Sequence, residues 1–169
     1  MHNPAHTGTT LSLMSLNIHK GFTTLNTRFV LPALRHAIRQ VGADVVLLQE
    51  VHGRRAEAPD ERQIEYLADA VWPQHAYGRN AVYPRGDHGN AVLSRFPILE
   101  ATNHDVSQGG PERRGLLHCV IDVPGAREPL HVVCVHLGLL ERHRQKQLRQ
   151  LDLLLQRDVP AGAPLVVAG

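Results

Sequence analysis

Continuous apolar runs, typical of strands, alternate with apolar residues at helical spacing in the first third of the chain. Residues 11–18 form an apolar-rich run that predicts a strand, and residues 45–48 are four consecutive aliphatic residues, typical of a strand covered on both faces. Between these runs, apolar residues recur at helical spacing, which predicts a helix capped by Asn26 or Thr27 and ended by Gly42. The residues that carry this spacing are Val30, Leu31, Leu34, Ile38 and Val41.

A second helix is predicted after a polar, arginine-rich segment. The segment from His52 to Asp60 lacks apolar periodicity and is predicted to be a surface loop. Helical spacing then returns, and Pro73 ends it because proline cannot continue a helix. The apolar positions of this second helix are Ile64, Leu67, Ala68 and Val71.

Short apolar runs separated by turn-forming residues occupy the middle of the chain and predict antiparallel strands. A third helix follows, with its apolar face at 148–155 and its end near Pro160, and residues 164–169 predict a last strand. This order of elements indicates a mixed α/β fold in which helices cover sheets. The four middle runs are residues 76–82, 90–96, 116–123 and 130–135.

Composition is that of one globular domain. The 169 residues are 43% hydrophobic and 20% charged, which suits a chain with a substantial core. The net charge of +2 permits an anionic partner without requiring one. The first residues have no basic and apolar leader pattern, and no apolar run approaches the roughly 18 residues of a membrane span. These features favour a cytoplasmic protein without a transmembrane segment.

Two cysteines lie in neighbouring strand-like runs. If those runs form a hairpin that turns near residues 126–127, Cys119 and Cys134 fall opposite one another. A cross-strand disulfide is then one outcome, but a reducing cytoplasm favours two buried free thiols.

Three predicted strands are each followed directly by a polar residue that can bind a ligand. These residues are Asn17, Glu50 and His136. In layered α/β folds, functional sites form outside strand ends, where side chains of several strands converge. Each residue taken singly is more often structural, as a turn former, a solvated carboxylate or a hydrogen-bonded imidazole. The threefold repetition is what favours a shared site.

The same segments carry a family resemblance that spans essentially the whole chain. Four short motifs occur in order, Leu-Asn-Ile-His-Lys-Gly at 16–21, Leu-Gln-Glu at 48–50, Gly-Asn-Ala-Val-Leu-Ser-Arg-Phe-Pro-Ile at 89–98 and Val-His-Leu at 135–137. In this order they resemble the endonuclease/exonuclease/phosphatase superfamily of DNase I-like proteins. The form Asn-Ile-His-Lys-Gly is most similar to small bacterial members.

The resemblance implies a four-layered α/β sandwich and a Mg²⁺- or Mn²⁺-dependent attack of water on a phosphoester. Carried over by position, Glu50 is the metal-binding carboxylate, and Asn17 helps to position the metal and the phosphate. His136 then hydrogen-bonds the scissile phosphate and assists the leaving group. Mg²⁺ prefers oxygen ligands and is commonly held by one or two carboxylates together with substrate phosphate, which agrees with these roles.

Additional phosphate contacts have weaker support. Arg113 or Arg114, just before an expected strand, could pair with a phosphate through its planar fork of donors. Asn90 lies inside a family motif, and its two expected roles are a phosphate contact and bracing of the backbone.

The chain has 12 histidines, so some are expected to lie near a candidate site by chance. His19 and Lys20 neighbour Asn17 and are candidates to line the same pocket. His88 and His104 are predicted to be loop residues. A zinc hydrolase is a poor fit, because the sequence has no His-x-His, His-Glu-x-x-His or paired-cysteine spacing.

Family members continue from a strand like 165–169 into Gly-Asp-Phe-Asn, whose Asp and Asn orient the attacking water and the phosphate. Gly169 matches only the first residue of that motif. We therefore expect the chain to be the N-terminal two thirds of a single domain, with an incomplete sandwich. We expect little or no turnover from the 169 residues, and hydrolase activity from the parent protein.

The substrate expected from the resemblance is a phosphoester, with nucleic acid slightly ahead of lipids and small phosphodiesters. Aromatic residues make up only 4% of the chain and give no evident platform for stacking bases. Two alternatives stay open at this point. The first is a catalytically inactive module that uses the same cleft to bind an anionic ligand. The second is an ordinary α/β domain in which Asn17, Glu50 and His136 are structural.

Overall fold

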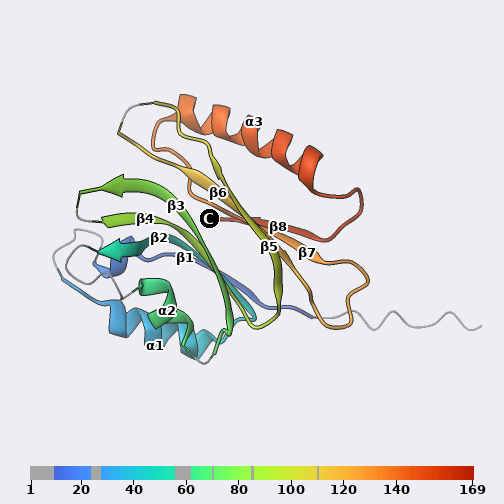
Figure 1. Ribbon diagram of the computed structural model, residues 1–169, viewed down its shortest axis with the longest axis horizontal. Coiled ribbons are helices and arrows are strands. Elements are labelled where there is room, and N and C mark those ends of the chain that lie inside the picture. Colours follow the sequence, from blue (N-terminus) through green and yellow to red (C-terminus); the bar gives the residue numbers. More distant parts are fainter. Residues whose placement is uncertain (1–9, 24–27, 56–61, 70, 85, 110) are drawn as a thin grey trace, which may run out of the picture.

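The computed structural model describes residues 10–23, 28–55, 62–69, 71–84, 86–109 and 111–169. Two four-stranded sheets face each other, with helices on the outer side of each (Figure 1). The four layers confirm the α/β sandwich predicted from the sequence. The first sheet has the order β1–β2–β4–β3, with β1 at Leu13–Asn17, β2 at Val45–Arg55, β3 at Gln74–Tyr83 and β4 at Gly86–Ser94.

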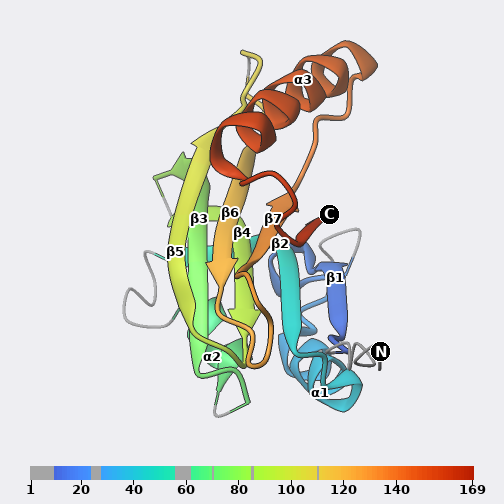
Figure 2. The same ribbon diagram turned by 90° about the vertical axis from the view of Figure 1, so that its right-hand side faces the viewer.

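The second sheet has the order β5–β6–β7–β8. Its first three strands are antiparallel, and β8 runs parallel to β7. Figure 2 shows β5, β6 and β7 of this sheet turned by 90°, with α3 (Glu141–Asp158) at their upper end. The strands are β5 at Ile98–Asp105, β6 at Gly115–Ile121, β7 at Leu130–Val135 and β8 at Leu165–Ala168.

Strand β2 lies between two apolar layers. Val45 and Leu47 face the second sheet, whereas Val46 and Leu48 pack toward α1 (Leu31–Val41) and α2 (Gln63–Ala68). All four side chains are 0% exposed, which confirms the predicted strand with both faces covered. A third apolar layer joins the second sheet to α3. The central position of β2 fixes the residues that follow Leu48 relative to both sheets.

Helix α1 ends as predicted but begins later. Gly42 adopts the left-handed conformation, and its N–H donates to the carbonyl of Ile38, which closes the helix. The helix starts at Leu31, with Val30 at the N-cap position and a proline in the first turn, a place where proline is favoured. The predicted caps, Asn26 and Thr27, lie outside the described residues. None of the helices in the described ranges is long and apolar enough to cross a membrane.

The sequence misplaced several boundaries. Strand β2 continues to Arg55 instead of giving way to a loop at His52, because these residues pair with β4; the rest of the predicted loop, residues 56–61, lies outside the described part. Helix α2 ends at Ala68, before Val71. Strand β5 was not predicted at all. It pairs with only one neighbouring strand and is largely exposed, so it lacks the apolar run that marks a buried strand.

The two cysteines are buried free thiols, as expected, but they are not opposite one another. Cys119 pairs with Val132 and Cys134 with Leu117, so the thiols are offset along the β6–β7 ladder. Burial raises the pKa of each thiol to about 12, which keeps both protonated and unreactive.

Candidate functional site

Glu50 is turned out of β2 by an irregularity in strand pairing. The register shifts between Leu48 and Val51, so that Gln49 and Glu50 together face the single residue Asn90 of β4. Glu50 has a φ of 54°, a conformation that is uncommon and strained for a glutamate. Bulges of this kind aim a side chain away from the strand. The strand therefore does not end before Glu50, as the sequence suggested; it bends there.

The residues after β1 approach the Glu50 carboxylate. Asn17 donates from Nδ2 to Oε1 of Glu50 at 3.0 Å, and its own Oδ1 accepts the backbone N–H of His19 at 2.9 Å. The short 3-10 helix η1 (His19–Gly21) then brings His19 Nδ1 to 3.8 Å and Lys20 Nζ to 3.7 Å from Oε2 of Glu50.

Backbone strain is concentrated here. Of the four non-glycine residues with positive φ in the described ranges, three are His19, Lys20 and Glu50. Each such conformation costs of the order of 1–3 kcal/mol and persists only where the surroundings enforce it. Strain of this kind clusters at functional sites, so its presence around one carboxylate favours a site over a surface ion pair.

His136 reaches the cluster from the second sheet. It follows the last residue of β7, and its Nε2 lies 3.8 Å from Oε1 of Glu50. The structure thus brings Asn17, Glu50 and His136 together at the position where two sheets meet. Their roles in chemistry stay a prediction.

The environment sets complementary charges on two of these groups. Burial opposes ionisation of Glu50, but the hydrogen bond from Asn17 and the electrostatic attraction of Lys20 and of His136 and His19 in their protonated forms outweigh it and lower the pKa of the carboxyl below its usual range. Burial, helped by the nearby Arg114 charge, lowers the pKa of His136. Near neutral pH the site therefore holds an ionised carboxylate beside a neutral imidazole.

Arg114 lies close to His136, but its fork is already engaged. Nη2 donates to Glu112 Oε1 at 2.7 Å and Nε donates to the carbonyl of Leu137 at 3.0 Å, while Nη1 donates to the carbonyl of Arg113. The Arg114 side chain is only 12% exposed, and its hydrogen bond to the Leu137 carbonyl holds the segment that follows His136. A phosphate contact from Arg114 would have to be made in addition to these bonds.

Glu112 is a member of this surrounding network that the sequence did not reveal. Besides pairing with Arg114, it accepts the backbone N–H of Leu139 at 3.1 Å and lies 3.7 Å from His143 Nδ1. Its only sequence signal is its place before an arginine pair, and that pattern is too common to single it out.

Asn90 braces the two sheets. Its side chain is 0% exposed, and Nδ2 donates to the carbonyls of Gly115 at 2.9 Å and Cys134 at 3.2 Å. Both amide hydrogens therefore bind backbone of the second sheet, directly opposite the Glu50 bulge. Of the two roles expected from the sequence, this geometry supports bracing.

We predict that Asn90→Ala lowers the free energy of unfolding by about 1–3 kcal/mol, because two buried carbonyls lose a donor. Urea unfolding at unchanged slope measures the loss. Gln40→Ala, on an exposed position of α1, is the control and should change stability little. An equal effect of the two substitutions would contradict the bracing role.

His88 and His104 lie in strands, not in loops. His88 pairs with His52 across β4 and β2, and His104 pairs with Leu116 across β5 and β6. Burial, with the charge of Lys20, lowers the pKa of His88 to about 4. His88 is therefore neutral at neutral pH. His104 lies elsewhere, on the outer face of the second sheet.

The donor set around Glu50 suits a hard divalent cation. The carboxylate is ionised although partly buried, and Lys20 already lies near Oε2 at a distance too long for a hydrogen bond. Asn17 Oδ1 keeps a second lone pair beside its bond to His19. Oxygen donors of this type fit Mg²⁺ or Mn²⁺.

Comparison with known proteins connects this geometry to a family. Residues 14–169 match the model of the Endonuclease/Exonuclease/phosphatase family. The chain is 52% identical over 164 residues to the protein YbhP of Escherichia coli (strain K12), which covers 93% of this chain. It spans 64% of the length of that relative.

Solved structures show the same fold. An endonuclease/exonuclease/phosphatase from Beutenbergia cavernae superposes with a TM-score of 0.75 at 28% identity, over 94% of this chain and 46% of its own. TDP2 of D. rerio, in a complex with a single-strand DNA product, gives a TM-score of 0.65 at 22% identity, over 93% of this chain and 58% of its own.

Proposed function

Because this chain belongs to the Endonuclease/Exonuclease/phosphatase family, we propose that it supplies the metal- and phosphate-binding part of a divalent-metal-dependent phosphodiester hydrolase. The observation that carries the proposal is the position of the Glu50 carboxylate, held on a strained bulge and surrounded by Asn17, His19, Lys20 and His136. A carboxylate used only for packing or solubility would not need this backbone conformation.

Glu50 is the proposed metal ligand, and Asn17 fixes the direction of its carboxylate. The hydrogen bond from Asn17 Nδ2 occupies one side of Oε1 and leaves Oε2 directed toward Lys20 and His19. Mg²⁺, when bound, polarises phosphoryl oxygens and offsets the negative charge that grows as water attacks. Asn17 Oδ1 can add a metal or water contact through its remaining lone pair.

His136 is the proposed partner of the scissile phosphate. As a neutral imidazole it can donate one N–H to a phosphoryl oxygen, and it approaches Oε1 of Glu50, whereas Lys20 lies near Oε2. Lys20 then offers positive charge to the same phosphate, and His19 offers a ring nitrogen beside it. Arg114 is a positioning residue, because its bond to the Leu137 carbonyl fixes the segment beside His136.

The proposed substrate class is the phosphodiester, with single-stranded nucleic acid as the first candidate. The similar fold of TDP2 was solved with a single-strand DNA product, and the Lys20 ammonium beside Glu50 suits a polyanion. We further propose that the group that activates water belongs to residues past Gly169 of the parent protein, where the resemblance places the Asp-Phe-Asn of the motif that Gly169 begins.

The test measures hydrolysis of bis(4-nitrophenyl) phosphate with Mg²⁺ or Mn²⁺, using the 169-residue chain and the parent protein translated past Gly169. We expect the parent protein to cleave, EDTA to stop cleavage, and the short chain to bind Mg²⁺ with little turnover. Cleavage that survives EDTA would contradict the metal role. Binding of phosphate ligands by both forms without any cleavage would favour the inactive binding module instead.

A further inference from the structure

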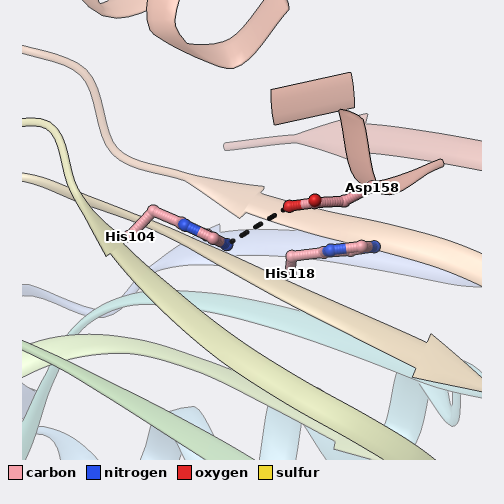
Figure 3. A group of neighbouring side chains, drawn as sticks. All are labelled: His104, His118 and Asp158. Atoms are coloured by element: carbon pink, nitrogen blue, oxygen red, sulfur yellow. Dashed lines mark ion pairs between the residues drawn. The ribbon is translucent and has the colours of Figure 1, made fainter. Parts of the chain in front are cut away.

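A second group of ionisable residues lies on the outer face of the second sheet, away from Glu50. His104 of β5 faces Leu116 of β6, and His118 follows two residues later on the same face. The two residues that flank His118 in sequence, Leu117 and Cys119, point to the opposite face and belong to the core between the sheets. Asp158, the last residue of α3, comes down onto this face, so that three elements meet there (Figure 3).

The three side chains are close enough to share one ligand. Each offers one ligand atom, and these atoms all lie within 4.8 Å of one another. His104 Nε2 lies 4.0 Å from Asp158 Oδ2, as the dashed line in Figure 3 marks. That nitrogen is buried and has no hydrogen-bond partner, which carries a free-energy cost unless something else satisfies it.

His118 has the supporting contact that metal-binding histidines usually have. Its Nε2 lies 2.9 Å from Nδ1 of His131, on the next strand. When His118 Nε2 donates this hydrogen bond, Nδ1 of His118 is left as the nitrogen for a ligand, and the direction of the ring is held by His131. A second ring nitrogen held in this way is typical of histidines that bind metal ions.

We propose that His104, His118 and Asp158 bind a transition-metal ion of the Zn²⁺ type. Two imidazoles and one carboxylate form a donor set that Zn²⁺ accepts, with water in the fourth position. In a tetrahedral site with bonds of about 2.0–2.1 Å, ligand atoms lie about 3.3 Å apart, so the side chains must close by about 1 Å. An adjoining cavity of about 550 Å³, lined partly by these residues, admits water and the ion.

The protonation states agree with this role. Burial lowers the pKa of His104 and of His118, and the hydrogen bonds from Arg157 lower the pKa of Asp158. Near neutral pH the cluster therefore holds two neutral imidazoles and one carboxylate, which are the forms that bind metals.

Arg157 is the main competitor for Asp158. Its Nε and Nη2 donate to the two carboxylate oxygens at 2.6 and 2.7 Å. The arginine side chain is 66% exposed, so it can move aside or share the carboxylate, whose two oxygens have about four acceptor positions. A bound ion would join the end of α3 to β5 and β6. Such an ion is independent of the proposed magnesium site, since the two clusters share no residue.

The test is equilibrium binding of Zn²⁺ and Co²⁺ to the metal-free protein, with Co²⁺ absorption as a readout of tetrahedral geometry. We expect one such site, and His104→Ala and Asp158→Asn should each weaken binding more than tenfold. Asp158→Asn keeps the size of the side chain and tests the cluster even if His104→Ala fails to fold. His131→Ala should weaken binding about 10- to 100-fold, the effect of losing an outer hydrogen-bond partner.

Glu50→Gln and His36→Ala are the matched controls, because they remove a carboxylate and an exposed imidazole elsewhere. Both should leave Zn²⁺ affinity unchanged and preserve the Co²⁺ spectrum. The proposal is overturned if Glu50→Gln abolishes binding while Asp158→Asn does not. It is equally overturned if the folded wild-type protein shows no tetrahedral Co²⁺ spectrum.

Discussion

Glu50→Gln is expected to reduce metal-dependent phosphodiester cleavage by the parent protein by roughly 10³-fold. Glutamine keeps the size of the side chain and can still accept the hydrogen bond from Asn17, so the bulge should survive. What is lost is the negative charge, which is present in the wild-type site because the pKa of Glu50 lies below its usual range. Steady-state kcat/KM and a Mg²⁺ titration measure the effect together.

Glu65→Gln is the matched control, since Glu65 is an exposed carboxylate on α2. It should leave both activity and Mg²⁺ affinity unchanged. If Glu50→Gln kept wild-type Mg²⁺ affinity, the carboxylate would be a structural group, and the alternative of an ordinary α/β domain would regain support.

His136→Asn is expected to lower kcat by about 10²- to 10⁴-fold, the range for a residue that transfers or shares a proton in the transition state. The pH dependence gives a sharper signature. Because the pKa of His136 lies below 6.5, the imidazole stays neutral at pH 7 and becomes charged only as the pH falls through that lowered value. The charged ring would then pair with Glu50, 3.8 Å away, and draw the carboxylate from the metal.

The wild-type rate should therefore fall on the acid side, at a pH below 6.5, and the variant should lose that limb of the profile. His75→Asn, at an exposed position of β3, is the control and should keep both the rate and the acid limb. An acid limb that persists in His136→Asn would assign it to another group.

The layers of the fold were predictable because burial leaves a direct mark on the sequence. The aliphatic run at 45–48 lies between two apolar layers, and the repeated pattern of strand followed by ligand-capable residue led to Asn17, Glu50 and His136. Strand β5 left no such mark, since most of its side chains face solvent.

The finer features depend on contacts between distant segments. The bulge at Glu50 arises from a register shift against β4, and no local signal encodes it. The same holds for the offset of Cys119 from Cys134, which the β6–β7 pairing decides. The partners of Arg114, Glu112 and the Leu137 carbonyl, could not be predicted because they are brought to it only by folding, and a phosphate contact from Arg114 stays a prediction.

The meeting of His104, His118 and Asp158 is a further example. These residues are spread over 55 positions of sequence, from 104 to 158, and follow no metal-binding spacing. Strand pairing aligns the two histidines, and α3 adds the carboxylate. Only the sheet register and the helix end make them neighbours.

The most direct test of the central claim, that Glu50 binds the catalytic metal, is a crystal structure of the protein grown with Mn²⁺ and its anomalous difference map. The account predicts a peak about 2.1 Å from a carboxylate oxygen of Glu50, in agreement with oxygen ligation, and displacement of Lys20 from that oxygen. The account would be contradicted by a crystal in which Mn²⁺ occupies other positions at full occupancy while Glu50 still lies beside Lys20 and His136.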